Sequence, residues 1–365
     1  MTGPLAVVGA TGLTGRLVAA HLVATGQRVR LVGRRREALD LLAAQLPGPT
    51  EVRVADVHDP HALRAALEGS AAVCSTAGPF RRLGPPVLDA CLDLALPYVD
   101  TSAEQPWLRE AQARGDERAR RAGVAVLPAV ACEFAPSGAA AWIAQERVGP
   151  LEALDVRYRL DGFRPSGGTL ASAVGTLDAP WVGHADGWRT ADRRSLRPRA
   201  ADDPDEACVP FPGGDEILLP PEVPTLREVR TWLVLPRAQA WSYALFAGLG
   251  RRLGPALGRE TLAGLERRLG AGTDPDARTR AASRFRVDVE AQGLRGRCTV
   301  RVEGHDVYRT SAALAGTAAT WLAQGRARAA GVHTVGAVLE AADLLDVFGP
   351  TGPTPRGLTW AIHAA

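Results

Sequence analysis

Short apolar runs alternate with amphipathic stretches along the first third of the chain. The apolar runs occupy residues 4–8, 28–32, 50–55, 71–75, 97–100 and 123–128. Between them, apolar positions recur every three or four residues, as in 13–23 and 36–46, which is typical of a helix with one buried face. Strands that alternate with helices in this way predict an α/β fold with a doubly wound parallel sheet and right-handed crossovers.

The pattern changes to a period of two from Leu151 onward. Apolar and charged residues alternate over 151–161, 226–235, 285–290 and 297–302. This alternation is typical of strands with one solvated face, and it predicts a second α+β domain with a mixed or antiparallel sheet. We expect a helix over 331–347 and a strand over 357–362.

Length and composition fit a globular protein of two domains. The chain has 365 residues, of which 46% are hydrophobic and 23% charged. No apolar run approaches the roughly 20 residues that a membrane span needs, and the chain enters a strand too early for a signal peptide. Five scattered cysteines without CxxC spacing favour a reducing cytoplasm and argue against a structural zinc.

The charged residues exclude two classes of function. The net charge is only +3 and the basic residues form no aromatic-laced stripe, so we expect no nucleic-acid partner. The chain contains no lysine, and all 43 basic residues are arginine. Because arginine forms no Schiff base and does not deprotonate at working pH, mechanisms that need a catalytic lysine are excluded.

A glycine-rich turn joins the first apolar run to the first helical stretch, with the sequence Gly9-Ala10-Thr11-Gly12-Leu13-Thr14-Gly15. Gly9 permits the tight turn, Gly12 lets the backbone approach a pyrophosphate, and Gly15 allows the helix to pack on the strand. The N–H groups at the start of the helix would face the phosphates. The motif predicts a Rossmann-type dinucleotide site whose contacts include Thr11, Leu13 and Thr14; a βα turn without ligand is the alternative.

The end of the second run indicates which dinucleotide binds. Arg34, Arg35 and Arg36 stand where an NAD site usually places an acid for the ribose hydroxyls. Arg34 or Arg35 can hold a 2′-phosphate through a planar fork, which predicts NADP(H). A basic helix start is the alternative, and it explains Arg36 but not the missing acid.

Two further segments complete the predicted cofactor site. Asp56 follows the third run, where it either lies near the adenine or caps the helix that begins at Pro60; the cap is the favoured interpretation. The fourth run ends in Ala77-Gly78-Pro79. We expect this turn against the nicotinamide half of the cofactor, since ligands of open α/β sheets collect at the carboxyl edge.

The segments 8–15, Gly33-Arg34, 76–80 and Tyr98-Val99-Asp100 together resemble the saccharopine dehydrogenase-like reductases, a group that includes trans-acting enoyl reductases. The resemblance is good over about the first third of the chain. It implies an NADP-dependent oxidoreductase with a Rossmann domain and a substrate domain. It also implies that the C-terminal tail returns to the nucleotide domain, so the predicted domains are 1–130 together with 331–365, and 131–330. The glycine turn is shared with short-chain dehydrogenases, but those need a Tyr-x-x-x-Lys pair that this chain cannot supply.

Three residues near the carboxyl edge are candidates for catalysis: Asp100, Ser102 and Glu133. A hydride acceptor needs a group that stabilises or neutralises developing charge, and a carboxyl or hydroxyl group can do so. Glu133 and Ser137 fall in a segment that resembles the family, where Glu133 stands in place of its first acid. Cys132, His305 and Tyr308 are weaker candidates, and for each of these residues a cap or a structural hydrogen bond is the alternative. No metal site is expected.

Three functions stay open. The first is reduction of an activated C=C in an apolar, enoyl-type substrate, which the tryptophans Trp181, Trp188, Trp232 and Trp241 favour as a group. The second is a C=N reductase or saccharopine-type dehydrogenase, and the third is a non-catalytic NADP(H)-binding protein. Expected partners are a small apolar substrate and either a second copy of the chain or a carrier protein. The apolar stretch 241–257 favours core packing over a surface helix that touches a partner or lipid.

Overall fold

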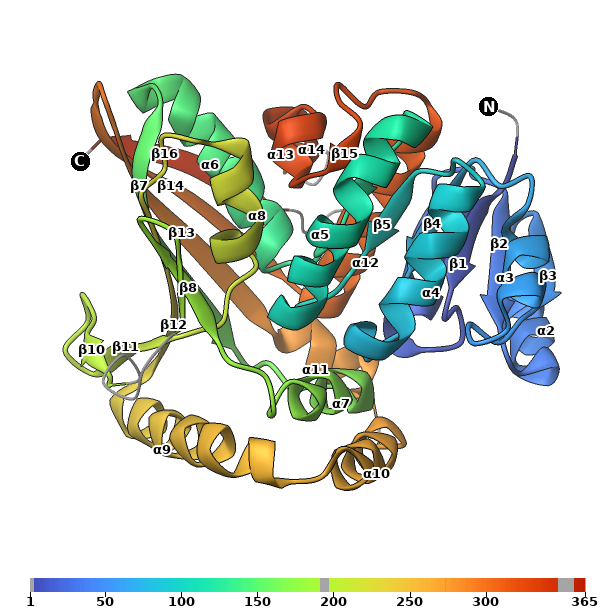
Figure 1. Ribbon diagram of the computed structural model, residues 1–365, viewed down its shortest axis with the longest axis horizontal. Coiled ribbons are helices and arrows are strands. Elements are labelled where there is room, and N and C mark those ends of the chain that lie inside the picture. The colour runs from blue at the N-terminus through green and yellow to red at the C-terminus, as the bar shows by residue number, and fades with distance from the viewer. Residues whose placement is uncertain (1–2, 191–196, 273, 347–357, 365) are drawn as a thin grey trace. The chain divides into compact units, whose positions relative to one another are not determined.

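The computed structural model describes residues 3–190, 197–272, 274–346 and 358–364. The chain divides into two compact units (Figure 1). Unit 1 comprises Met1–Ala135 and Val307–Glu340, and unit 2 comprises Pro136–Asp306 and Ala341–Ala365. Two domains were predicted, and the boundaries are described below.

Unit 1 is built on a parallel sheet. Its strands are β1 (Leu5–Val8), β2 (Val29–Gly33), β3 (Thr50–Val54), β4 (Ala72–Ser75), β5 (Tyr98–Asp100), β6 (Ala125–Leu127) and β15 (Gly331–Val332). They lie in the order β15-β6-β5-β4-β1-β2-β3, and every neighbouring pair is parallel. The first six strands have the order of a dinucleotide-binding fold, with a switch point between β1 and β4. The predicted doubly wound sheet is confirmed.

Helices cover both faces of this sheet, which explains why β1 is buried along its whole length. The helices are α1 (Leu13–Ala24), α2 (Arg36–Gln45), α3 (Pro60–Leu67), α4 (Phe80–Asp93), α5 (Gln105–Ala122), α12 (Val307–Ala323) and the short α13 (Val335–Val338). Helices α3, α4 and α5 pack side by side on one face, whereas α12 packs on α1 and on strands β1, β4 and β5 (Figure 1).

Unit 2 is built on a mixed sheet. Its strands are β7 (Leu151–Asp161), β8 (Val182–Ala185), β9 (Trp188–Thr190), β10 (Arg199–Ala200), β11 (Glu206–Pro210), β12 (Glu228–Pro236), β13 (Arg284–Gly293), β14 (Gly296–His305) and β16 (Thr359–Ala364). The main order is β10-β11-β12-β7-β13-β14-β16, with β8 and β9 attached at β12. The pair β7–β12 is parallel and the other pairs are antiparallel. The predicted α+β domain with a mixed sheet is confirmed.

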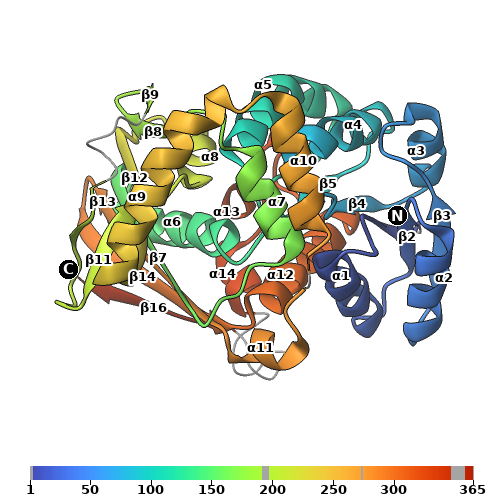
Figure 2. The same cartoon turned by 90° about the horizontal axis from the view of Figure 1, so that it is seen from below.

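The helices of unit 2 are α6 (Phe134–Val148), α7 (Gly167–Gly175), α8 (Asp215–Glu222), α9 (Arg237–Leu253), α10 (Arg259–Gly270), α11 (Ala277–Ala282) and α14 (Ala341–Asp346). A 3-10 turn, η2 (Gly254–Ala256), follows α9. Helix α9 packs on β11 and β12. In the view from below, α9 lies in front of these strands (Figure 2).

The observed division differs from the predicted one at two places. Helix α12 was expected in the second domain but belongs to unit 1, because its small residues allow close packing on α1. The strand expected over 357–362 was predicted to return to the nucleotide domain, but β16 pairs with β14 in unit 2. The segment predicted as one helix over 331–347 forms β15, α13 and α14, with residue 347 outside the described residues. Only 331–340 returns to unit 1.

Candidate cofactor and active site

The glycine turn has the geometry that the sequence predicts. Gly9 adopts a left-handed φ of +79°, and a Cβ there would lie 2.9 Å from the backbone nitrogen of Ala77. A Cβ on Gly15 would lie 2.8 Å from Cα of Ala10 and would press into the carbonyl oxygen of Gly9. The nearest atom to a Cβ on Gly12 would be 3.4 Å away, so folding tolerates a side chain at that position. Folding therefore does not require glycine at position 12. The absence of a side chain there lets a ligand approach the backbone closely.

The N-terminus of α1 is available for an anion. Among the described residues, no side chain caps this helix, whose N-cap is Gly12. Uncapped N–H groups and the positive end of the helix dipole favour a phosphate at this place. Thr11, Leu13 and Thr14 lie in this turn or the first turn of α1, as the sequence places them.

The three arginines after β2 have different surroundings. Arg36 forms an ion pair with Asp40 at 2.8 Å, one helical turn further on, which fits a basic helix start. Arg35 Nη2 donates to Thr11 Oγ1 at 3.4 Å, which brings this guanidinium next to the glycine turn. Arg34 is exposed, and within the described ranges it makes no ion pair or hydrogen bond. A guanidinium without a protein partner beside the glycine turn is suited to a 2′-phosphate.

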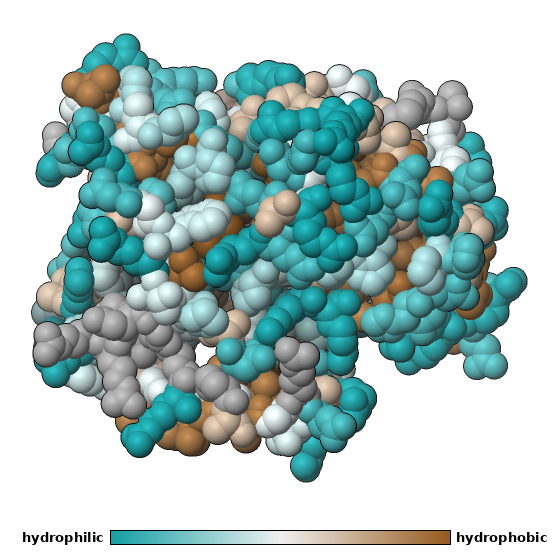
Figure 3. Space-filling view, viewed as in Figure 1, coloured by the Kyte–Doolittle hydropathy of each residue, from teal (hydrophilic) through white to brown (hydrophobic). Residues whose placement is uncertain are grey.

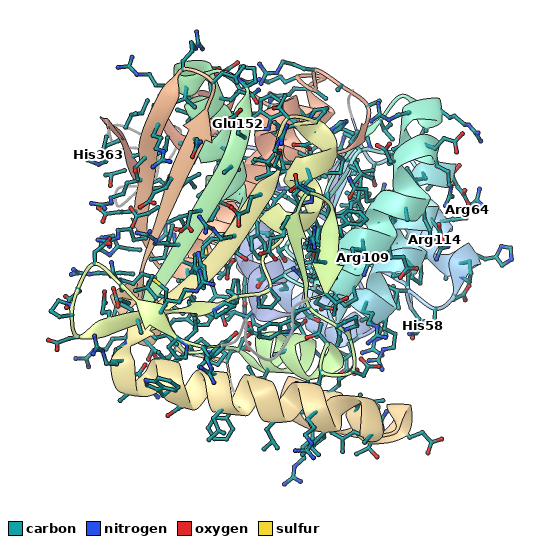
Figure 4. All side chains as sticks on the ribbon, turned by 60° about the vertical axis from the view of Figure 1, so that its left-hand side comes forward. His58, Arg64, Arg109, Arg114, Glu152 and His363 are labelled. Carbon is teal, nitrogen blue, oxygen red and sulfur yellow. The ribbon has the colours of Figure 1, made fainter. Side chains whose placement is uncertain are left out.

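Asp56 does not cap a helix. Its side chain is exposed and accepts from the backbone nitrogen of His58 at 2.9 Å, within the loop after β3. Asp59 caps α3 instead, accepting from the backbone nitrogens of His61 and Ala62. The favoured cap interpretation of Asp56 is wrong, because Asp59 directly precedes Pro60 while Asp56 closes a local turn. His58 marks this loop in Figure 4.

The loop predicted to face the nicotinamide lies against the glycine turn. Thr76 Oγ1 donates to the carbonyl oxygens of Val8 at 3.0 Å and Gly9 at 3.3 Å, across the switch point. The loop continues through Ala77, and Gly78–Pro79 is a cis peptide bond. These contacts bring the ends of β1 and β4 together at the carboxyl edge of the sheet.

Glu104 holds the far end of this loop, a role that the sequence analysis missed. Its carboxylate accepts from the backbone nitrogens of Phe80 at 2.7 Å and Arg81 at 2.8 Å, and the side chain is 2% exposed. Glu104 therefore caps α4 from a distant loop. No local sequence signal indicates this contact, because the two capped nitrogens lie more than 20 residues earlier in the chain.

Asp100 is the centre of a buried hydrogen-bond network. Its Oδ2 accepts from Tyr98 Oη and Trp107 Nε1, both at 2.8 Å. Its Oδ1 accepts from the backbone nitrogen and the hydroxyl of Ser102, at 2.9 and 2.6 Å, and from the nitrogen of Ala129 at 2.9 Å. Asp100 and Ser102 have no exposed surface. The structure brings Asp100 and Ser102 together, but it buries both side chains away from solvent.

Asp100 also fixes the loop that carries Glu133. Ala129 takes a left-handed φ of +60°, and the next nitrogen, of Val130, donates to the carbonyl oxygen of Asp100 at 2.7 Å. At the other end of the loop, the nitrogen of Cys132 donates to Ser311 Oγ at 2.9 Å. Glu133 is partly exposed, and burial of its carboxyl group raises its pKa. Of the three predicted catalytic residues, it alone reaches the surface. Its raised pKa means that its carboxyl group holds a proton to higher pH than usual.

A second buried carboxyl group lies in unit 2. Ser137 Oγ donates to Asp215 Oδ1 at 2.6 Å, and Tyr158 Oη contacts both Ser137, at 3.1 Å, and Asp215. Desolvation raises the pKa of Asp215 to about 6, and the two hydroxyl groups oppose that shift. The cluster joins α6, β7 and α8. Ser137 belongs to a segment noted in the sequence, whereas Asp215 lies in a polar stretch without a recognisable signal.

The tryptophans of unit 2 lie in separate surroundings. Trp188 is 47% exposed, and its Nε1 donates to the carbonyl oxygen of Glu216 at 3.2 Å. Trp232 Nε1 donates to Asp155 at 3.0 Å. Trp241 is exposed on α9, and Trp181 is partly buried. The four tryptophans therefore come from four different segments of unit 2.

The described residues also bear on two other kinds of site. They contain no group of three or more His, Cys, Asp or Glu side chains placed to hold a metal ion. None of the described helices is both long and apolar enough to span a bilayer.

Comparison with known proteins identifies the first domain. Residues 5–127 match the saccharopine dehydrogenase NADP-binding domain. A saccharopine dehydrogenase-like oxidoreductase of Arabidopsis thaliana is 26% identical over 215 residues, which are 53% of this chain and 46% of that protein. A trans-acting enoyl reductase of Mycobacterium leprae is 29% identical over 180 residues, 46% of this chain and 43% of the relative. The chain thus spans less than half the length of these relatives.

The fold of the whole chain also has a known counterpart. Saccharopine dehydrogenase (L-Glu forming) of Saccharomyces cerevisiae superposes with a TM-score of 0.63 at 13% identity, covering 99% of this chain and 100% of the yeast protein. The predicted fold, the resemblance of the first domain and its NADP-binding character are confirmed. Residues 5–127 form a saccharopine dehydrogenase-type NADP-binding domain, and the chain is similar to saccharopine dehydrogenase-like oxidoreductases.

Proposed function

We propose that this protein is an NADPH-dependent reductase that transfers hydride to an activated C=C of an apolar, enoyl-type substrate. The observation that carries the cofactor preference is Arg34, exposed and without a protein partner among the described residues, at the end of β2. Gly9, Gly12 and Gly15 form the turn that receives the pyrophosphate. NADPH supplies the hydride when bound, and the chain supplies orientation and a proton.

In this proposal, Glu133 is the proton donor. Its partial exposure permits contact with a substrate, and its raised pKa keeps a proton available closer to neutral pH. Hydride adds to the β-carbon of the conjugated C=C, and the proton from Glu133 completes reduction at the α-carbon. Asp100 and Ser102 are positioning residues, since their network holds the loop before Glu133. Glu104 positions the loop of Ala77, Gly78 and Pro79 through the start of α4.

The names of the relatives support an enoyl substrate, since two trans-acting enoyl reductases align with 29–30% identity over 33–43% of their length. Reduction of a C=N bond in an amino-acid-like substrate is the second candidate, and the whole-chain likeness to a saccharopine dehydrogenase fold favours it. A non-catalytic NADP(H)-binding role is the third. A carrier-bound thioester and a homodimer are the partners that the first candidate suggests. The five buried cysteines, none in a disulfide, fit a cytoplasmic location.

The cofactor assignment can be tested with a matched pair of arginines. We expect NADPH to bind at least about tenfold more tightly than NADH, since a charge-assisted phosphate contact contributes about 1.5–3 kcal/mol. Arg34→Asp should abolish this preference by weakening NADPH binding alone. Arg36→Asp is the control, because that guanidinium is already paired with Asp40. Equal affinity of the wild type for both coenzymes would refute the 2′-phosphate argument.

Turnover separates the three candidate functions. NADPH oxidation is measured with apolar enoyl thioesters and with 2-oxo acid and amine mixtures. Activity with the thioesters supports the first candidate, activity with the mixtures the second, and tight NADPH binding without turnover the third. Glu133→Gln should lower kcat about 10²-fold or more with NADPH affinity unchanged. Glu340→Gln, which removes a surface carboxylate paired with Arg328, is the control and should leave kcat unaltered.

A further inference from the structure

Helix α9 of unit 2 presents its large apolar side chains outward. Trp241, Leu245, Phe246, Leu249 and Leu253 are between 47% and 71% exposed. Four of them recur every four residues and Phe246 lies beside them, so they share one side of the helix. The core packing favoured by the sequence is wrong for this side of the stretch 241–257.

The opposite side of α9 carries the contacts to unit 2. Ala240 is fully buried and packs with Ala207 and Val209 of β11, and Tyr243 packs against the same cluster. The side of α9 that packs on the sheet therefore bears small residues and one tyrosine, while the bulky residues face away. An ordinary surface helix has the reverse arrangement. In the space-filling view, hydrophobic atoms appear among polar ones at the lower left, where Figure 1 draws α9 (Figure 3). Side chains project from α9 away from the sheet that Glu152 and His363 mark (Figure 4).

The charged residues of α9 are all arginines. Between Arg237 and Gly258 the chain contains no aspartate or glutamate. Arg237 and Arg252 are exposed, and Arg252 follows Leu249 by three residues, within the apolar side of the helix. The following helix, α10, carries charges of both signs, with Arg267, Arg268 and Glu260 exposed. An apolar side with Trp, Phe and Leu that is flanked by arginines complements an anionic lipid surface, in which aromatic rings and guanidinium groups lie at the headgroup level.

We propose that the outward side of α9 docks on the surface of an anionic lipid bilayer. The helix lies in the plane of the interface, with Leu245 and Phe246 in the acyl boundary and Arg237 and Arg252 at the headgroups. Charge argues against a second copy as the occupant, because two α9 helices would bring arginines together with no carboxylate on either helix to pair with them. Projecting side chains at up to 71% exposure insert into lipid without a preformed complementary surface.

Vesicle co-sedimentation tests the proposal with the full chain. The probes are two kinds of vesicle, one of phosphatidylcholine alone and one of phosphatidylcholine with about 30% phosphatidylglycerol. The phosphatidylglycerol gives the second kind a negative surface potential. We expect binding to the anionic vesicles that weakens as salt rises. The double variant Leu245→Gln/Phe246→Gln should bind at least about tenfold more weakly, and Arg237→Glu/Arg252→Glu should lose the preference for anionic lipid.

Leu294→Gln is the matched control, since Leu294 is 68% exposed at the turn between β13 and β14. It should bind vesicles like the wild type. NADPH binding and the thermal midpoint show that each variant is folded. The proposal is overturned if the wild type does not sediment with anionic vesicles, or if the Leu245/Phe246 variant sediments as well as the wild type. A dimer in analytical ultracentrifugation that this variant abolishes, without vesicle binding, would assign the surface to a second copy instead.

Discussion

Replacing Asp100 by asparagine tests whether this residue positions the active site. Asparagine keeps the shape of the side chain but turns one oxygen into an NH₂ group. The amide oxygen is best placed toward Ser102 and Ala129, which supply three donors. The NH₂ group then faces Tyr98 Oη and Trp107 Nε1. The tyrosine hydroxyl can rotate to accept, but the indole N–H is a donor only and is left without an acceptor.

The magnitude follows from that single unpaired donor. A hydrogen bond to a charged group contributes about 1.5–3 kcal/mol, and a buried donor without an acceptor costs about 1–3 kcal/mol. We expect Asp100→Asn to lower the free energy of unfolding of unit 1 by about 2–4 kcal/mol. Urea unfolding measures it, and the relevant transition is the one whose midpoint NADPH raises, because ligand binding stabilises the folded state of its own domain.

A double-mutant cycle isolates the cause. Trp107→Phe removes the indole N–H, so Asp100→Asn should destabilise that background by at least about 1 kcal/mol less than it destabilises the wild type. Asp89→Asn, which changes a partly exposed carboxylate paired with Arg114 and Arg118, is the control and should cost less than about 1 kcal/mol. An Asp100→Asn protein as stable as the wild type, or a cycle without coupling, would refute this account.

Three further predictions concern separate positions. Gly15→Ala should lower the stability of unit 1 by about 1–3 kcal/mol, because the added Cβ would meet backbone atoms. Gly12→Ala should leave stability unchanged and weaken NADPH binding. Urea unfolding measures the first effect and fluorescence titration with NADPH the second. Asp215 has a pKa raised to about 6, so its contribution to stability is full below pH 3.8 and is lost as pH rises through about 6. Asp215→Asn should therefore gain about 3 kcal/mol relative to the wild type between pH 4 and pH 7 in unfolding experiments, and parallel pH profiles would contradict the raised pKa. Glu104→Gln leaves one N–H of α4 without its acceptor and should lower the NADPH-dependent kcat and the thermal midpoint together, while an unchanged kcat would show that the loop is held by other contacts.

The nucleotide half of the protein was predictable because its signals are local. The glycine turn, the alternation of strand and helix, and the arginines after β2 each depend on a few consecutive residues. Gly9 shows this plainly, since its positive φ is a property of one peptide unit in one turn. The period-two pattern of unit 2 likewise revealed its strands, because a strand with one solvated face carries that pattern in its own sequence.

The remaining features depend on contacts between distant parts of the chain. Ser137 and Asp215 are 78 residues apart and meet only through the packing of α6 and α8, and Glu104 caps a helix that precedes it in the sequence. Strand β16 pairs with β14. This pairing was not predictable, because the sequence of a strand does not specify which sheet edge it joins. For the apolar stretch that forms α9, the sequence did not indicate which side of the helix the sheet would cover. The sequence determines which residues share a face, and only the tertiary structure decides what that face meets.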